Sequence, residues 1–244
     1  MYIYETHLHT REASKCSHTY AELYPQYYKR LGYSGIFITD HFFNGSTCIS
    51  SFHSWEKRIK LFCKGYENAK KAAEGMDFSV FFGVEYNFEG DEFLLYGIDK
   101  EWLIEHPEIM HQSRKGLYEI IDNAGGLMVQ AHPFRERRYI STIHLSPVYC
   151  HAWEGYNSHN TDINNQNAVS YCNEHNIFMT AGSDLHKLNS IPEKEHFGMQ
   201  FNSPLTCEKD YVNAIKSRHG QIYVADCRIV KPGQIITNTP VVVH

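Results

Sequence analysis

Short strand-like runs alternate with helix-like runs along the whole chain, and this alternation most constrains the fold. Strands are expected at 1–6, 35–39, 78–84, 127–130, 152–156, 177–180 and 197–201, with a further short strand at 93–97. Helices are expected at 20–31, 54–74, 107–124, 162–175 and 208–218. Such alternation is typical of parallel strands joined by helical crossovers. A length of 244 residues fits one large α/β barrel domain.

Polar residues of metal-ligand type follow the predicted strands. In parallel barrels the C-terminal ends of the strands form one rim, and active sites are built there from loops after several strands. The sequence therefore predicts that side chains far apart along the chain meet at one site. These are His7 and His9, Asp40 and His41, Glu85, His132, Asn157, and Asp184 with His186.

The spacing and type of these residues favour a metal site. In an extended segment, residues i and i+2 point to the same side, as in His7-Leu8-His9 and Asp184-Leu185-His186. Imidazoles mixed with hard oxygen ligands suit zinc, manganese or iron(II). Glu85 follows an apolar run, where a buried carboxylate is costly unless it is paired or metal-bound.

Each motif alone has a plainer interpretation. The His pair fits an exposed edge strand, Asp40 fits a helix N-cap, and Glu85 fits a loop start. The repeated placement of ligand-type residues after strands is what favours the metal site.

Composition excludes several other classes. A net charge of -5 and the lack of a basic stripe disfavour a double-stranded nucleic-acid partner. The 7 Cys, at positions 16, 48, 63, 150, 172, 207 and 227, contain no C-x-x-C pair, so a thiolate zinc site and a disulfide framework are not expected. With neither a signal peptide nor a membrane-length apolar run, the sequence favours a reducing cytoplasm.

The motifs also match a known family in their order. His-x-His at 7–9, Thr-Asp-His at 39–41, Gly-Val-Glu at 83–85, Ala-His-Pro at 131–133 and Gly-Ser-Asp-x-His at 182–186 closely resemble the polymerase and histidinol phosphatase (PHP) superfamily. The resemblance covers about residues 1–220. It implies a distorted, TIM-like barrel of seven β/α units, two or three divalent metal ions (Zn, Mn or Fe), and hydrolysis of phosphate esters.

The resemblance also implies roles for individual residues. It assigns His7, His9, Glu85 and Asp184 to a first metal. Glu85 would bridge to a second metal held also by His132. His41 and His186 would hold a third metal, for which Asp184 is a candidate bridge. Asp40 would orient a ligand imidazole through its other ring nitrogen.

Two positions depart from the family pattern. A His shortly after the third-strand Glu is missing, so the second metal would be completed by water, Asp91 or Glu92. The family's Asp or His after the first motif is also missing, and Glu12 or His18 is the candidate third-metal ligand. We favour Glu12, which is nearer and offers hard oxygen atoms.

The expected chemistry is attack of a metal-bridging hydroxide on phosphorus, with Asp184 and Arg135 as catalytic residues. Arg135 is the candidate phosphate-binding residue, although it could instead be a solvated loop residue. Arg11 and Lys187 are weaker candidates for this role. Two further residues, His159 and His196, are candidates for facing the substrate.

The expected protein is thus a metal-dependent phosphoesterase acting on a small phosphomonoester or a nucleotide. The expected domain covers 1–230, followed by a tail at 231–244. A histidinol-phosphate phosphatase is a narrower alternative, because Cys16-Ser17-His18 resembles that branch's Cys-Pro-His segment at a longer spacing. A non-catalytic metal-binding barrel and a hydrolase of other bonds are alternatives of other kinds.

Overall fold

A nine-stranded sheet organises the computed structural model, which describes residues 1–88, 90–225 and 230–244. Its order is β10-β9-β1-β2-β3-β4-β5-β7-β8. The strands are β1 (Tyr2–Glu5), β2 (Gly35–Ile38), β3 (Ser79–Phe88), β4 (Asp91–Tyr96), β5 (Leu127–Gln130), β7 (Ala152–Asn157), β8 (Met179–Gly182), β9 (Phe197–Phe201) and β10 (Gln221–Val224). Cys227 lies outside the described residues.

The predicted fold class is confirmed, and two antiparallel additions enlarge the sheet. Strands β1, β2 and β3 are parallel, and so are β5, β7 and β8. Between these groups β4 runs antiparallel to both β3 and β5. At the other side β9 pairs antiparallel with β1, and β10 pairs with β9. The predicted parallel pattern therefore holds in the two groups and fails at β4 and β9.

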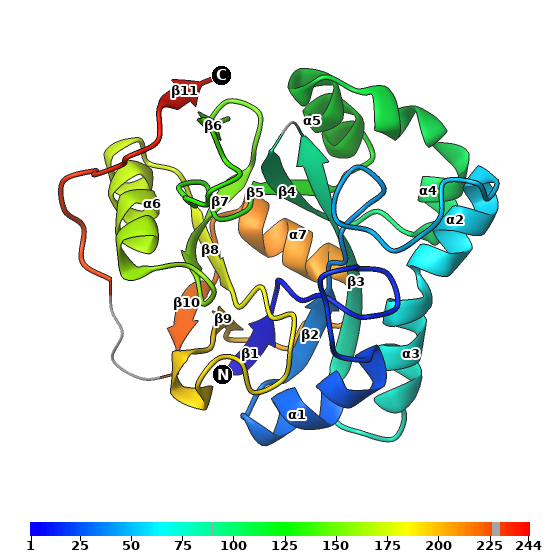
Figure 1. The fold of residues 1–244 in the computed structure, drawn as a ribbon. Helices are drawn as coiled ribbons and strands as arrows, with labels where there is room; N and C mark the ends of the chain where they lie inside the picture. Colours follow the sequence, from blue (N-terminus) through cyan, green and yellow to red (C-terminus); the bar gives the residue numbers. More distant parts are fainter. Residues whose placement is uncertain (89, 226–229) are drawn as a thin grey trace.

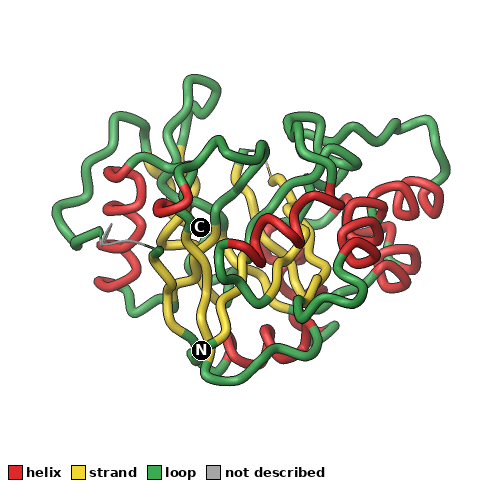
Figure 2. Tube along the Cα trace, turned by 90° about the horizontal axis from the view of Figure 1, so that it is seen from below, coloured by secondary structure: helices red, strands yellow, loops and turns green. Residues whose placement is uncertain are grey.

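The helices surround the sheet, as Figures 1 and 2 show. They are α1 (Tyr24–Arg30), α2 (Trp55–Phe62), α3 (Lys64–Ala72), α4 (Lys100–Glu105), α5 (Arg114–Asn123), α6 (Asp162–Glu174) and α7 (Glu208–Lys216), with short 3₁₀ turns at Ala21–Leu23, Pro107–His111 and Glu193–Glu195. The helix predicted at 54–74 is two helices, broken at Cys63. The helix predicted at 107–124 begins as a 3₁₀ turn and restarts where the Ser113 side chain accepts a hydrogen bond from Gly116 N. None of the described helices is long and apolar enough to cross a membrane.

The segments that follow β1 and β8 pair with each other and nearly close the barrel. Leu8 and Leu185 form a parallel bridge. Asp184 N donates to His7 O at 2.8 Å, and His9 N donates to Leu185 O at 3.1 Å. The first and last ligand motifs of the sequence are therefore locked side by side by backbone hydrogen bonds.

Helix α7 covers the opposite end of the barrel and crosses the ring of strands in Figure 1. Lys209 Nζ donates to Gly125 O, just before β5, at 2.9 Å. The Tyr211 ring lies 4.7 Å from the Phe37 ring and 5.0 Å from the Tyr96 ring, measured between centroids. An apolar core thus fills the barrel from the amino ends of the parallel strands, and the carboxyl ends stay free for a site.

The segment predicted as a tail returns to the barrel rim. It reaches β11 (Val241–Val243), which pairs parallel with β6 (Ile143–Leu145). On the way, the Glu136 carboxylate accepts hydrogen bonds from Asn238 N at 2.6 Å and Thr239 N at 3.0 Å. The C-terminal residues consequently brace the loop between β5 and β7.

Gly182 tests how tightly the barrel closes. A Cβ atom at this position would lie 2.6 Å from His7 Cβ and 3.0 Å from Glu154 Oε1. Since overpacking of a tight interior destabilises a protein, we expect Gly182→Ala to lower the free energy of unfolding by about 2 kcal/mol. Urea unfolding of metal-free protein measures this. Gly45→Ala, whose Cβ would make ordinary contacts, is the control. Equal unfolding midpoints for Gly182→Ala and wild type would contradict the tight closure.

Candidate metal centre

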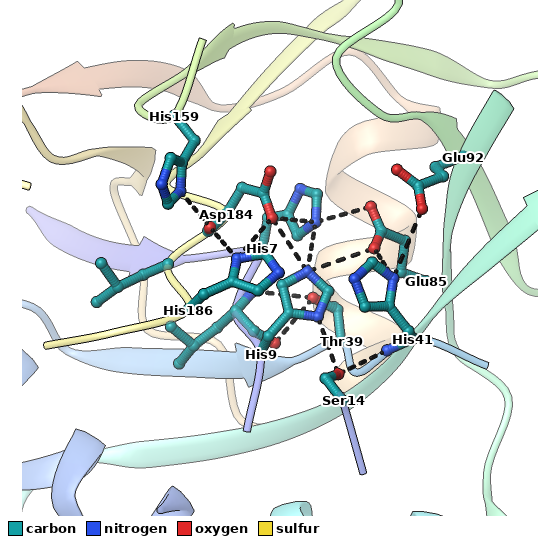
Figure 3. A network of polar contacts seen from close by, with 12 residues as sticks. His7, His9, Ser14, Thr39, His41, Glu85, Glu92, His159, Asp184 and His186 are labelled. Atoms are coloured by element: carbon teal, nitrogen blue, oxygen red, sulfur yellow. Dashed lines mark hydrogen bonds and ion pairs between the residues drawn. The ribbon is translucent and has the colours of Figure 1, made fainter. Parts of the chain in front are cut away.

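The predicted ligands meet at the carboxyl ends of the strands (Figure 3). Their donor atoms form overlapping groups in which all atoms lie within 4.8 Å of one another. The groups are His7/Glu85/His132, His7/His9/Asp184, His9/His41/His186, His41/Glu85/Glu92 and His159/Asp184/His186. Residues from seven separate segments therefore build one continuous cluster.

The first predicted metal position has the tightest set of donors. His7 Nε2 lies 3.0 Å from Glu85 Oε1 and 3.5 Å from Asp184 Oδ1. His9 Nε2 lies 3.1 Å from Asp184 Oδ1 and 3.3 Å from Glu85 Oε2. All four side chains are almost completely buried. Two imidazoles and two carboxylates thus converge on one point.

Glu92 fills the position where the sequence lacks the family's His. Its Oε2 lies 3.4 Å from His132 Nε2, which is itself 3.2 Å from Glu85 Oε1. Glu92 arrives from β4, the antiparallel strand beside β3. The other candidate, Asp91, is engaged by Arg114, with Nη2 and Oδ2 2.9 Å apart. Of the two acidic candidates, the structure brings only Glu92 to the cluster.

The third predicted position contains three imidazoles and no Glu12. The His9 ring stacks against the rings of His41 and His186, with both centroid distances 4.2 Å. The Glu12 carboxylate instead accepts hydrogen bonds from Ala21 N at 3.1 and 3.2 Å and from Asn68 Nδ2 at 3.0 Å. The expected role of Glu12 as a ligand is therefore corrected, because its oxygens are already used at the start of the first helical turn.

Cys16, which the sequence did not single out as a ligand, faces this third position. The alternative residue His18 is exposed, and only its backbone N–H reaches the site, donating to His186 O at 2.8 Å. The Cys16 thiol lines the same pocket as the imidazoles of His41 and His186. Burial raises the pKa of this thiol, but the two imidazoles outweigh that effect and lower it to about 6.

Buried acceptors fix the orientation of two ligand imidazoles. Glu154 Oε1 lies 3.0 Å from His7 Nδ1, leaving Nε2 for the centre. Asp40 Oδ1 accepts from Ser14 Oγ at 2.6 Å, and that hydroxyl lies 3.2 Å from His9 Nδ1. Asp40 thus reaches the His9 imidazole through the Ser14 hydroxyl and not by direct contact. Such outer contacts fix the tautomer and ring position of a ligand.

Two site residues hold a backbone conformation that side-chain-bearing residues rarely adopt. His132 has φ 29° and Asp184 has φ 57°. Left-handed backbone at non-glycine residues is strained and clusters at functional sites. The strained backbone of His132 is stabilised by a hydrogen bond from its N–H to Glu154 Oε2 at 3.0 Å.

The local field keeps the carboxylates ionised and one central imidazole neutral. Burial raises the pKa of the Glu85 carboxyl, but the neighbouring imidazoles, His41 first, hold it well below its usual range. Burial likewise raises the pKa of Asp184, and Arg135 outweighs it. For His9, burial and the nearby imidazoles lower the pKa well below its usual value. An ionised carboxylate and a neutral imidazole are the forms that bind a cation. For His7 and His41, burial lowers the pKa, but the neighbouring carboxylates outweigh it and raise the pKa well above its usual value.

Two buried polar atoms of the site lie close together without forming a hydrogen bond. His41 Nδ1 and Glu85 Oε2 approach to 2.7 Å, yet neither makes a hydrogen bond. Buried polar groups without partners are rare in native proteins. A bound divalent ion would give both atoms a partner, so the donor set fits the two or three divalent ions that the sequence predicts.

Arg135 is partly buried at the edge of the cluster and contacts three acceptors. Its Nη1 lies 2.6 Å from Asp184 Oδ2. Its Nε donates to Asn160 Oδ1 at 2.8 Å, and its Nη2 donates to Asn157 Oδ1 at 2.9 Å. Asn157, expected at the rim, thus supports an arginine. Arg135 is therefore a fixed part of the site and not a solvated loop residue.

A pocket of about 520 Å³ opens on this cluster. His41, His132, Asp184 and His186 lie at its base, and Tyr139, Ile140, Ile143 and His144 form a wall on the β5–β7 side. The volume suits a small molecule.

The weaker candidates are placed as follows. His159 Nδ1 lies 2.7 Å from Asp184 O, so it borders the centre. His196 is fully buried away from it, with Nε2 3.3 Å from Tyr27 Oη. Arg11 and Lys187 are exposed and do not line the pocket.

Solved structures share this fold. A two-domain protein from Bacteroides vulgatus, containing a predicted PHP-like metal-dependent phosphoesterase, matches with a TM-score of 0.68 at 15% identity, over 91% of this chain and 64% of that one. A protein from Bifidobacterium adolescentis, assigned by prediction as a metal-dependent phosphoesterase, matches with a TM-score of 0.50 at 15% identity, over 88% and 96%. The chain therefore has the fold of PHP-like metal-dependent phosphoesterases.

A third match is an amidohydrolase from Chromobacterium violaceum with bound sulfate and no metal. Its TM-score is 0.48 at 11% identity, over 92% of this chain and 98% of that one. Neither the models of known protein families nor the sequences of curated proteins match this chain.

The orienting role of Glu154 gives a test of the centre. We expect Glu154→Ala to weaken metal binding about 10- to 100-fold, because His7 loses the contact that fixes its ring. Competition with a chromogenic chelator measures the affinity. Glu12→Ala is the matched control, since its carboxylate lies outside the cluster, and should bind metal like wild type. The reverse ranking of the two variants would restore Glu12 as a ligand.

Proposed function

We propose that this protein is a metal-dependent phosphoesterase that hydrolyses a small phosphomonoester or a nucleotide. One observation carries the proposal: buried His and carboxylate groups that share Glu85 and Asp184 open, together with Arg135, on a pocket of small-molecule size. Imidazole and oxygen donors suit zinc, manganese or iron. The shared fold is consistent with this chemistry.

The residues proposed to hold the ions follow the geometric groups. They are His7, His9, Glu85 and Asp184 for a first ion, Glu85, His132 and Glu92 for a second, and His41 with His186 for a third. Bound ions of this kind lower the pKa of a water molecule and neutralise charge on phosphate oxygens.

Arg135 is proposed to bind the phosphate group. A guanidinium carries five N–H donors, and Asp184, Asn157 and Asn160 use one each. The two remaining donors belong to Nη1 and Nη2, and Arg135 lines the pocket. A planar donor pair held by its own neighbours is suited to phosphate oxygens.

A hydrolase is favoured over a non-catalytic metal-binding barrel. The alternative without catalysis rests on the missing His after Glu85, and Glu92 offers a donor at that position. The six described cysteines are free, which supports the further proposal of a reducing, cytoplasmic location.

Metal-dependent hydrolysis of p-nitrophenyl phosphate is the direct test. We expect no hydrolysis by metal-free protein and activity on loading with Mn²⁺ or Zn²⁺. We expect Asp184→Asn to lose at least about a hundredfold in kcat/KM, because the shared ligand loses its charge. The exposed His219→Ala variant is the control and should match wild type. A panel with mononucleotides and histidinol phosphate then ranks substrates. Metal-loaded protein inactive on the whole panel would overturn the proposed function.

Arg135 and its neighbour Arg138 form a matched pair. We expect Arg135→Ala to lower kcat/KM about 10²- to 10³-fold, since it removes donors aimed at the phosphate. Arg138→Ala, which changes an exposed arginine of the same loop, should stay near wild type. Steady-state kinetics are measured alongside metal content, because Arg135 also contacts Asp184. Equal kinetics for the two variants would rule out Arg135 as the phosphate-binding residue.

A further inference from the structure

We propose that Cys16 is a thiolate ligand of the third metal position, beside His41 and His186. This inference rests on the proposed metal centre and adds a sulfur donor to it. A thiolate ligand is not expected from the cysteine spacing, because the 7 Cys contain no C-x-x-C pair.

The first observation is the lack of an acidic residue belonging to this position alone. Glu85 and Asp184 serve the first position, and Glu85 and Glu92 border the second. The group at the third contains only imidazoles, those of His9, His41 and His186. Asp184 Oδ1 lies 3.5 Å from His186 Nδ1, but this carboxylate also serves the first position, so the third position shares its negative charge with another ion. A thiolate would add a negative charge that belongs to this position alone.

The second observation is the placement of the thiol. Cys16 lines the pocket together with His41 and His186, so its thiol and the two imidazoles border the same space. Among the residues described, the acidic candidate for this position, Glu12, points to Ala21 and Asn68 instead.

The backbone around Cys16 is fixed to the ligands by hydrogen bonds. Ser17 Oγ lies 3.0 Å from both His9 O and His186 O, and His18 N donates to His186 O at 2.8 Å. On the other side, Lys15 N donates to Ser46 O at 2.7 Å. The loop that carries the thiol is therefore attached to the segments that carry two of the imidazoles.

The third observation is an unpartnered donor atom on one of these imidazoles. His41 is 7% exposed, and its Nδ1, which lies 2.7 Å from Glu85 Oε2, makes no hydrogen bond. A buried ring nitrogen without a hydrogen bond fits a metal ligand, and Cys16 lines the pocket beside the same ring. Cysteine and histidine together are ordinary ligands of zinc.

Cobalt substitution distinguishes a sulfur ligand from a bystander without any substrate. Metal-free protein is titrated with Co²⁺ in a thiol-free buffer and followed by absorption spectroscopy. Wild type should show a sulfur-to-cobalt charge-transfer band in the near ultraviolet. Cys16→Ser should lose this band. Cys207→Ser should keep it, since Cys207 lies at the exposed N-cap of α7, where serine is a favourable residue.

A second measurement needs no variant, in case Cys16→Ser folds poorly. X-ray absorption of the zinc-loaded wild type should show a zinc–sulfur distance of about 2.3 Å beside zinc–nitrogen distances of about 2.0 Å.

The outcomes separate this inference from the proposed function. Visible cobalt bands without the charge-transfer band would overturn the Cys16 ligand and leave the metal centre standing. A charge-transfer band that survives in Cys16→Ser would also overturn it. If no cobalt binds at all, both the ligand and the centre fail.

Discussion

The burial of one carboxylate among imidazoles is the interaction on which this structure depends. Glu85 is 1% exposed, and each of its oxygens contacts two ring nitrogens. Oε1 lies 3.0 Å from His7 and 3.2 Å from His132, while Oε2 lies 2.7 Å from His41 and 3.3 Å from His9. A buried carboxylate is stable only when groups of opposite charge or a bound cation lie beside it. The barrel rim brings the four imidazoles to Glu85 from segments that follow different strands.

The two ends of the barrel have different roles: the amino end holds apolar core, and the carboxyl end holds the site. Helix α7 packs aromatic side chains into the amino end, so the core does not need the carboxyl end. At the carboxyl end, hydrogen bonds between the segments after β1 and β8 hold His7 and Asp184 beside each other. The strained φ values of His132 and Asp184 show that ligand placement takes precedence over backbone preference.

The sequence predicts the residues that strands deliver and misses those that tertiary packing delivers. His7, His9, His132 and Asp184 lie just beyond strands, and Glu85 lies within β3, which continues to Phe88, so the barrel topology brings all five together. For the second metal the sequence leaves water, Asp91 and Glu92 as alternatives, and the antiparallel direction of the short strand β4, which brings Glu92 to the centre, is not visible in strand periodicity. Glu154 lies within β7, where a register shift between Glu154 and Tyr156 marks a bulge. Bulges re-aim side chains and have little sequence signal.

The loop residues show the same limit most clearly. The sequence favours Glu12 over His18, because Glu12 offers hard oxygen atoms and is closer in sequence to His9. Loop hydrogen bonds instead direct its carboxylate toward Ala21. The same loop turns Cys16 inward. Ligand type and spacing therefore predict a site on strand ends better than a site on a loop.

The central claim is a multi-metal centre built around Glu85, and anomalous X-ray diffraction from zinc- or manganese-loaded crystals tests it most directly. The account predicts two or three anomalous peaks per chain, with the strongest between His7, His9, Glu85 and Asp184. A fully loaded crystal with no peak beside Glu85, or with peaks only at surface histidines, would contradict it.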